Sequence, residues 1–214
     1  MALRSARSYI LSILLSVFLL SLFPSRVGAE DGSQIPPLEE FIGSITNGNQ
    51  DSLRGIYIPE ILAGRIVSQP EDDPAFVSGE ENTLTQFTLA AKAGSTGLLA
   101  HNYLAGKYFA RLQEGQVFYL VYGDGHVQEF VVADVQRFRA LDPENVWSSF
   151  LDLKHGTILS SAKLFSKVYD QPGKVILQTC IRANGRASWG RLFLIAEPSQ
   201  TTRAQDDLQA SGKR

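Results

Sequence analysis

The sequence predicts a mainly β protein built as a small barrel with short helices and long loops. Its apolar runs are short, rich in Val, Ile, Phe and Tyr, and separated by Gly, Pro, Asp and Asn, which is typical of strands joined by turns. The clearest pair is VFYLVYGDGHVQEFVV at residues 117–132, where two β-rich runs meet through Gly-Asp-Gly, a strong hairpin signal. Several runs alternate imperfectly between apolar and polar residues, as expected where both faces of a strand are covered in a barrel.

Seven strands are expected along the chain, each an apolar run bounded by turn residues: residues 55–58, 65–68, 97–101, 116–122, 128–138, 174–180 and 191–196. Helices are expected only as short pieces, at residues 38–45 after a proline, at 84–91, at 108–112 and within 144–167. A barrel with short helices and loops inserted between its strands accounts for these elements most simply.

The 214 residues favour one domain with extensions at both ends. Residues 30–52 are polar and interrupted by Pro and Gly, and are expected to be a lead-in segment. Residues 53–198 hold the apolar runs and are expected to form the barrel domain. Residues 199–214 contain almost no large apolar side chains, so a disordered tail is expected there.

Residues 1–29 have the three parts of a secretory signal. Arg4 and Arg7 precede an apolar and serine-containing stretch at residues 9–23, and Ala29 offers a cleavage site. The stretch is shorter than the ~20 residues of a membrane-spanning helix, which favours cleavage. An uncleaved anchor that attaches the protein to the membrane through residues 9–23 is the open alternative. Both predict an exported protein, extracellular or at the cell surface.

Composition narrows the set of partners and cofactors. The formal net charge is −2 with mixed signs along the chain, so no basic surface for nucleic acid is expected. Three scattered histidines and one cysteine do not make zinc-ligand spacing, so no metal site and no cofactor are expected. The carboxylates at residues 71–73, with Glu80 and Glu81, leave calcium as an alternative to a solvated acidic loop.

Cys180 is the only cysteine of the chain. In an oxidising compartment cysteines are useful in pairs, and a single one cannot form an internal disulfide. A lone exported thiol is therefore either buried as a small apolar side chain or used chemically. The residue type alone leaves both interpretations open.

Three stretches carry a pattern of residues with chemical potential. Leu-Ala-His-Asn at residues 99–102 contains His101, Ile-Leu-Gln-Thr-Cys at residues 176–180 contains Cys180, and Arg191 begins the next apolar run. A thiolate is a good nucleophile, and an imidazole can give a proton to a departing amine and recover it from an incoming one. An arginine can stabilise an oxyanion or hold a substrate carbonyl.

On these motifs the sequence resembles the sortases, exported cysteine transpeptidases of bacterial and archaeal surfaces, over residues 54–198. Ala100 stands where the family usually has glycine, and Ile176 where it usually has threonine. The resemblance implies an eight-stranded barrel of the sortase type with its site in a groove between strand ends. It also implies catalytic roles for His101, Cys180 and Arg191.

The activity implied by the resemblance is cleavage of a sorting motif in an exported protein through a thioacyl-enzyme, followed by transfer to a surface amine. A thiol peptidase or hydrolase of the same fold and a non-catalytic peptide-binding module are the alternatives. Thr179 and Asn102 flank the site and are candidates for substrate binding. Specificity is expected to lie in the loops at residues 71–84 and 142–174.

The other candidate residues have simpler interpretations. Arg182 and Arg186 compete with Arg191 for its role, but they fall in a predicted loop, whereas an apolar strand follows Arg191. His126 lies in a hairpin turn and His155 in a long polar connection, so both are expected at the surface. The candidate site therefore consists of one histidine, one cysteine and one arginine.

Overall fold

The computed structural model describes residues 35–200. The signal or anchor expected at residues 1–29 lies outside the described residues, as does the tail from residue 201 onward. No helix among residues 35–200 is long and apolar enough to cross a membrane. Ser199, at the start of the expected tail, is buried and donates its backbone N–H to Glu129 O.

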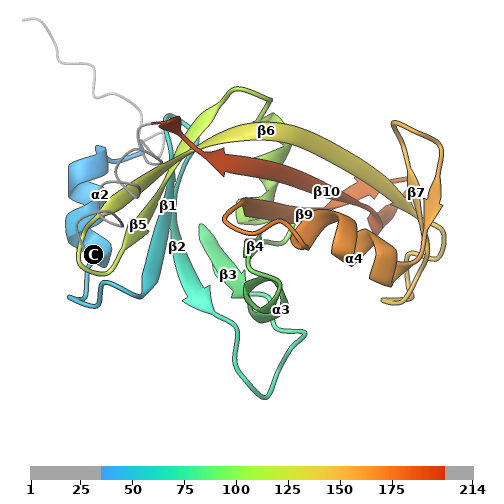
Figure 1. The fold of residues 1–214 in the computed structure, drawn as a ribbon, viewed down its shortest axis with the longest axis horizontal. Coiled ribbons are helices and arrows are strands. Elements are labelled where there is room, and N and C mark those ends of the chain that lie inside the picture. Colours follow the sequence, from blue (N-terminus) through green and yellow to red (C-terminus); the bar gives the residue numbers. More distant parts are fainter. Residues whose placement is uncertain (1–34, 201–214) are drawn as a thin grey trace, which may run out of the picture. The chain divides into compact units, whose positions relative to one another are not determined.

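The described residues are mainly β, as predicted, with few helices (Figure 1). The helices are α2 (Leu38–Ile45), α3 (Thr88–Lys92) and α4 (Ser161–Tyr169), with two 3-10 turns, η2 (Ala105–Lys107) and η3 (Phe109–Arg111). The strands are β1 (Leu53–Ile58), β2 (Leu62–Ser68), β3 (Thr83–Phe87), β4 (Thr96–Leu99), β5 (Val117–Tyr122), β6 (Val127–Ala140), β7 (Phe150–Asp152), β8 (Ile158–Leu159), β9 (Val175–Ala183) and β10 (Arg186–Pro198).

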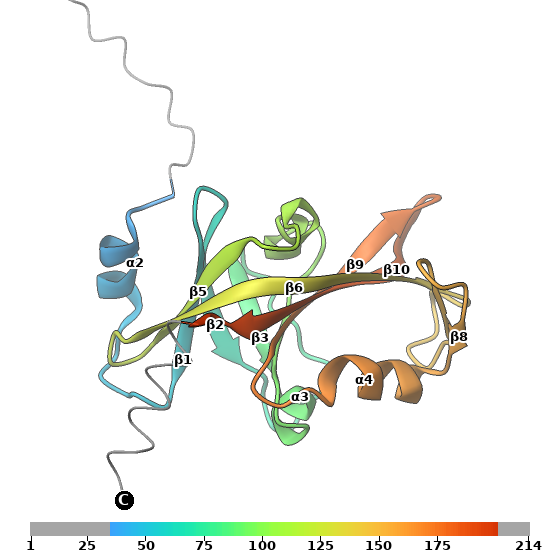
Figure 2. The ribbon, with the colours of Figure 1, turned by 45° about the horizontal axis from the view of Figure 1, so that its top comes forward.

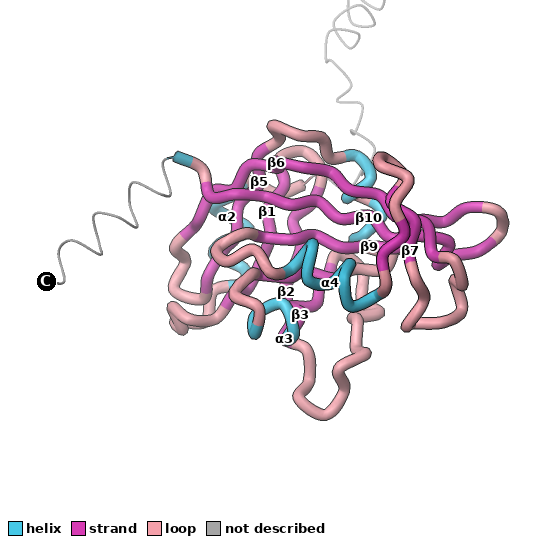
Figure 3. Tube along the Cα trace, turned by 45° about the vertical axis from the view of Figure 1, so that its right-hand side comes forward, coloured by secondary structure: helices cyan, strands magenta, loops and turns pink. Residues whose placement is uncertain are grey.

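Eight of the strands close into a barrel. The sheet runs in the order β10-β9-β4-β3-β2-β1-β5-β6-β7-β8, and an additional pairing of β10 with β6 closes the first eight strands on themselves. Figure 3 shows β6, β10 and β9 running side by side along one side of this barrel. The predicted eight-stranded β-barrel is confirmed, and closure leaves its strands without an exposed edge over the paired length.

Two long strands extend beyond the barrel and carry the remaining elements. β6 and β10 are 14 and 13 residues long, longer than any other strand described. Past the barrel, β6 continues into the short strands β7 and β8, and α4 returns the chain to β9 (Figures 1 and 2). Figure 2 shows α4 on one side of β9 and β10 and the 3-10 turns on the other. α4 and the 3-10 turns therefore cover opposite faces of β9 and β10.

β9 and β10 each contribute to two apolar clusters, because successive residues of a strand point to opposite faces of the sheet. On β9, Val175 and Leu177 belong to the cluster inside the barrel, whereas Ile176 belongs to the cluster under α4. On β10, Leu192 lies with the first cluster and Phe193 with the second. Both faces of β9 and β10 are thus covered, which explains why these runs do not alternate in the sequence.

The helix expected at residues 38–45 is present with those bounds and packs on the barrel. Phe41 and Ile45 are buried against Val121 of β5. Gly55 of β1 allows this close approach, because a Cβ there would lie 2.4 Å from the Ile45 side chain. The lead-in segment thereby contributes to the packed structure of the barrel domain.

The prediction of a helix at residues 84–91 is wrong for the first half of that range. Thr83–Phe87 forms β3, which pairs parallel with β2 and antiparallel with β4, and the helix begins only at Thr88. Leu84 is fully buried in the barrel core. Burial and two neighbouring strands favour the extended conformation over the local helical pattern, since tertiary packing overrides weak propensity.

Candidate active site

Cys180 and Arg191 lie directly opposite each other in the antiparallel pairing of β9 with β10. Directly paired residues on neighbouring strands point to the same face of a sheet. Both are half-buried, and the row continues across β6 to the buried Phe138, which pairs with Arg191. The thiol and the guanidinium group therefore share the face of the extension that also packs α4.

His101 is brought to this place by a different strand. β4 pairs parallel with β9, with Leu99 opposite Gln178, and the backbone N–H of Ala100 donates to Gln178 O at 3.1 Å. His101 follows the last paired residue of β4 by two positions, and its ring stacks on that of Tyr103, with the ring centres 5.2 Å apart. The predicted strand at residues 97–101 ends earlier, at Leu99, so His101 lies in the turn after the strand rather than on it.

The turn that carries His101 is fixed to β9 by Thr179. The buried Thr179 hydroxyl donates to Ala100 O at 2.8 Å. Gly106 packs closely against this contact and leaves no room for a side chain, because a Cβ there would lie 2.2 Å from Thr179 Oγ1 and 2.7 Å from His101 O. The sequence offered Thr179 as a substrate-binding residue; the contact seen here is with the backbone next to His101. Gly106 was not singled out, and only the close approach in the fold reveals its importance.

Asn102 links the same turn to β10. Its side-chain Nδ2 donates to Ala187 O at 2.9 Å. Ala187 lies where the register of β9 and β10 shifts, between Arg186 and Gly190. Ser188, also in this shift, donates its hydroxyl to Pro143 O at 3.0 Å. The His101 turn, the start of β10 and the loop after β6 are thus joined by side-chain hydrogen bonds.

The Arg191 guanidinium group is held beside the strand that carries it. Its Nη1 donates to Ser188 O at 3.2 Å and to Gly190 O at 3.0 Å. The guanidinium carbon lies 5.8 Å from the centre of the Phe150 ring, a cation–π distance. These contacts come from β10 itself and from β7, so the Arg191 side chain is held against its own strand and the Phe150 ring.

The predicted loop around the competing arginines is wrong. Arg182 lies within β9 and Arg186 is the first residue of β10. The two strands are joined by a two-residue turn at Asn184 and Gly185, whose φ angles are 49° and 75°. Asn-Gly is the favoured sequence for such a turn and was the signal in the sequence that predicts the longer strands.

Tyr169 and Gln178 connect α4 to the strand that bears Cys180. The Tyr169 hydroxyl donates to Gln178 Oε1 at 2.5 Å, and burial raises the pKa of that hydroxyl. The Tyr169 ring also packs edge-on against Phe87 and Phe193. Gln178 is two residues before Cys180 on the same face, so this contact fixes the position of α4 relative to the candidate site. Neither residue stood out in the sequence.

A cavity of about 530 Å³ includes Cys180 in its lining. β4 pairs with β9 only as far as Gln178, so β9 has no strand neighbour on that side beyond this residue. The cavity lies beside this edge and is also lined by Asn102, Thr179 and Trp189. Cys180 thus adjoins a space that a polypeptide segment could occupy.

The remaining histidines lie elsewhere and are paired with carboxylates. His126 Nδ1 lies 2.6 Å from Asp124 Oδ1, and hydrogen bonds from the backbone N–H of His126 lower the pKa of Asp124. His155 Nδ1 lies 3.0 Å from Asp152 Oδ2. Both histidines are exposed, as predicted. Within the described part of the chain, no group of three or more His, Cys, Asp or Glu side chains could hold a metal ion.

No family model matches the sequence, and no curated protein matches it. Several solved sortases are similar in fold. Sortase C-1 from Actinomyces oris has a TM-score of 0.46 and 16% identity over 78% of this chain and 83% of that one. Sortase C1 from Streptococcus suis has a TM-score of 0.47 and 11% identity over 76% and 78%.

Sortase A from Corynebacterium diphtheriae has a TM-score of 0.46 and 15% identity over 71% of this chain and 62% of that one. The chain therefore spans less than two thirds of the length of this last protein. Similarity at these levels concerns the fold and says nothing of the reaction.

Proposed function

We propose that this protein is a cysteine transpeptidase in which Cys180 is the nucleophile, His101 the proton carrier and Arg191 the oxyanion or carbonyl ligand. The observation that carries the proposal is the strand register. Cys180 of β9 pairs directly with Arg191 of β10, and β4, which ends two residues before His101, pairs parallel with β9 as far as Gln178.

The first half-reaction forms a thioester. The Cys180 thiolate attacks the carbonyl carbon of a peptide bond, and the negative charge moves to the carbonyl oxygen, where Arg191 can stabilise it. The C–N bond then breaks, and protonated His101 gives its proton to the departing amine. The acyl group is left on Cys180 Sγ, and His101 is neutral.

The second half-reaction transfers the acyl group. An amine attacks the thioester carbonyl and gives a proton to neutral His101. The C–S bond breaks, Cys180 leaves as a thiolate, and a new amide bond remains on the acceptor. The starting charge state of both residues is restored, so the cycle balances without a cofactor. With water in place of the amine, the same steps give hydrolysis.

The proposed substrate is an exported protein with a sorting motif, and the proposed acceptor is an amine at the cell surface. Both proposals draw on the apolar stretch at residues 9–23 after Arg4 and Arg7, which favours export. A cleaved signal would release the protein, whereas an uncleaved segment would hold it at the membrane. Either arrangement places the thiol outside the cytoplasm.

The test uses the purified protein with a randomised peptide library, with and without a primary amine, and product analysis by mass spectrometry. A product that joins library peptide to amine, formed by wild type but not by Cys180→Ala or His101→Ala, supports the transpeptidase. Cysteine-dependent release of free carboxylates alone would favour a hydrolase. Absence of any product that depends on Cys180 would leave only a binding function.

A further inference from the structure

Two adjoining hollows lie at the outer end of β9 and β10, and Trp189 lines both. The first, here called the Cys180 hollow, is the cavity of about 530 Å³ described above. The second, here called the Arg186 hollow, has a volume of about 490 Å³ and is formed by β6, β10, the turn between β9 and β10, and the loop after β6. The two hollows share Trp189 in their linings and are here together called the strip.

The strip is mainly on the face of the sheet away from α4. Arg137 pairs with Leu192, and Leu192 pairs with Thr179, so these three residues form one row on that face. All three line the Cys180 hollow. The next row outward pairs Arg139 with Gly190 and leads into the Arg186 hollow. The row of Cys180 and Arg191 points to the opposite face, and Cys180 joins the hollow at the free edge of β9.

Positive charge gathers along this strip. Among the described residues that line the two hollows, five are cationic and none is Asp or Glu: Lys107, Arg137, Arg139, Arg182 and Arg186. All five are exposed, and within residues 35–200 none of them takes part in an ion pair. The full chain carries a formal net charge of −2, so this arrangement is a local concentration and not an overall excess.

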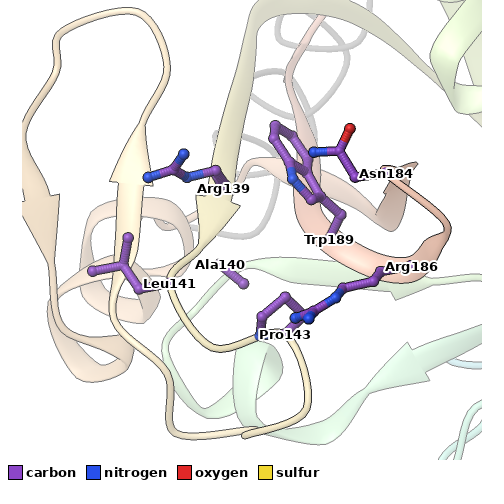
Figure 4. A pocket seen from close by; sticks show the side chains of 7 residues that line it. All are labelled: Arg139, Ala140, Leu141, Pro143, Asn184, Arg186 and Trp189. Carbon is purple, nitrogen blue, oxygen red and sulfur yellow. The ribbon is translucent and has the colours of Figure 1, made fainter.

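Apolar side chains form the floor between these charges. Leu153 in the Cys180 hollow and Leu141 in the Arg186 hollow are each 45% exposed, although both are large and apolar. Figure 4 shows the Arg139 and Arg186 guanidinium groups on different sides of the Arg186 hollow, with Trp189 and Asn184 on a third side. A ligand with alternating anionic and apolar groups would match this lining.

Solvated arginines alone would not indicate a ligand, since exposed charges are common on protein surfaces. Here they line two hollows that also expose apolar side chains, and no Asp or Glu is among the described lining residues. A lining that combines exposed apolar side chains with unpaired cations favours an amphipathic anion as the ligand over a uniformly charged polymer such as nucleic acid. The Cys180 hollow also lies beside the part of β9 after Gln178, which has no strand partner on that side within residues 35–200 and to which an extended peptide could add.

We propose that the strip formed by the two hollows binds an extended peptide whose acidic side chains alternate with apolar ones. The step from peptide ligand to substrate rests on the proposed function: the bound segment would be the part of the exported substrate that flanks the bond attacked by Cys180. Arg137, Arg182 and Lys107 hold its carboxylates near the nucleophile, and Arg139 and Arg186 hold those beyond Trp189. The strip thereby selects acidic substrates.

The test measures binding without turnover. Trp147 and Trp189 are the two tryptophans of the chain, so Trp147→Phe leaves Trp189 as the only indole reporter. Trp147 is 79% exposed and lines neither hollow, which makes its replacement a mild change. The full chain with Trp147→Phe and Cys180→Ala is titrated with a six-residue peptide of alternating leucine and glutamate, and with matched peptides that carry glutamine or lysine instead.

The glutamate peptide is expected to change Trp189 fluorescence and to bind at least about tenfold more tightly than the glutamine peptide, with a preference that weakens as salt is added. Arg182→Gln and Arg186→Gln should each weaken its binding by about two- to fivefold, the range for exposed charge pairs. Arg65→Gln, an exposed arginine on β2 outside both hollows, should leave it unchanged.

Equal affinity for the glutamate and glutamine peptides would overturn the proposal. An equal loss in Arg65→Gln and in the two hollow variants would also overturn it, since the attraction would then be general. Because the Cys180→Ala chain cannot form an acyl-enzyme, a failure of the proposed reaction leaves this measurement untouched. The two proposals can therefore fail independently.

Discussion

Arg191 lies opposite Cys180 across a single antiparallel strand pair, so one register places the two residues on the same face of the sheet. A shift of that register by one residue would move Arg191 to the other face of the sheet. The pairing of β10 with β6 runs through Arg191 and Phe138 and holds this register, whereas the register of β9 with β10 shifts between the Asn184-Gly185 turn and Gly190. The place of Arg191 opposite Cys180 thus depends on strand pairing, whereas His101 depends on the turn after β4.

Replacing Arg191 by lysine should lower kcat/KM. The decrease should correspond to a loss of about 2–4 kcal/mol of transition-state stabilisation, the range seen when an oxyanion donor is removed. Lysine keeps the charge but loses the planar set of donors. The control is Arg65→Lys, an exposed arginine of β2 outside both hollows, which should stay close to wild type. A similar loss in both variants would contradict the role proposed for Arg191.

The activity should follow a bell-shaped curve with pH. Attack needs a thiolate at Cys180, and departure of the amine needs a protonated imidazole at His101, so acid removes the first and base the second. A series of kcat/KM measurements between about pH 5 and 10 checks this. A flat profile over that range would contradict a mechanism that uses both groups.

Gly106→Ala should destabilise the protein by about 1–3 kcal/mol, the usual cost of overpacking a filled site. The added Cβ would lie 2.2 Å from Thr179 Oγ1 and 2.7 Å from the Ala100 and His101 carbonyl oxygens, so the turn that carries His101 must move. Urea unfolding measures the loss. Gly43→Ala in α2 is the control, because no atom lies within 4 Å of a Cβ there and alanine favours a helix. A loss no greater in Gly106→Ala than in this control would show that the turn tolerates a side chain.

Asp152 should make stability depend on acid pH. Burial raises the pKa of Asp152, but hydrogen bonds from the His155 side chain and from the backbone N–H groups of Lys154 and His155 lower it, and the net pKa falls below the ordinary value. A group whose pKa is lowered by folding stabilises the protein above its unfolded pKa of about 3.9 and loses that contribution as pH falls through the folded pKa.

Asp152→Asn should therefore lower the free energy of unfolding at pH 7 by about 1–3 kcal/mol, since charge-assisted hydrogen bonds are lost. The difference between variant and wild type should shrink below about pH 4. Thermal unfolding at a series of pH values measures both effects. A difference that stays constant from pH 7 to pH 2 would show that the carboxylate charge plays no part.

Much of the fold was readable from residue patterns. Val117–Tyr122 and the strand after it were predicted because a Gly-Asp-Gly turn joins two β-rich runs, and helix α2 was predicted with its observed bounds. The small barrel was predicted from the strand pattern and its eight strands from the resemblance, and the pairing of β10 with β6 confirms both. The strand at Thr83–Phe87 was missed because its two partners are distant in sequence, and no local pattern reveals them.

The candidate site shows the same division. His101, Cys180 and Arg191 were named from motifs, and the position of Cys180 opposite Arg191 follows from the register of β9 with β10. The residues that hold them were not foreseen. Gly106 matters only because two chain segments cross closely, and the Tyr169–Gln178 contact joins a helix and a strand whose relation is set by the whole fold. Such contacts depend on tertiary approach, which residue types alone do not encode.

The central claim is that Cys180 is a nucleophile, and the most direct measurement is the intact mass of the protein after incubation with the peptide library and rapid acid quenching. If Cys180 is the nucleophile, the wild-type chain should carry an added acyl group on Cys180, and hydroxylamine should remove it, as expected for a thioester. Cys180→Ala should fold normally and carry no adduct, because trimming one sulfur from a half-buried strand position removes little packing. An unmodified wild-type mass under conditions that give product, or full turnover by Cys180→Ala, would contradict it.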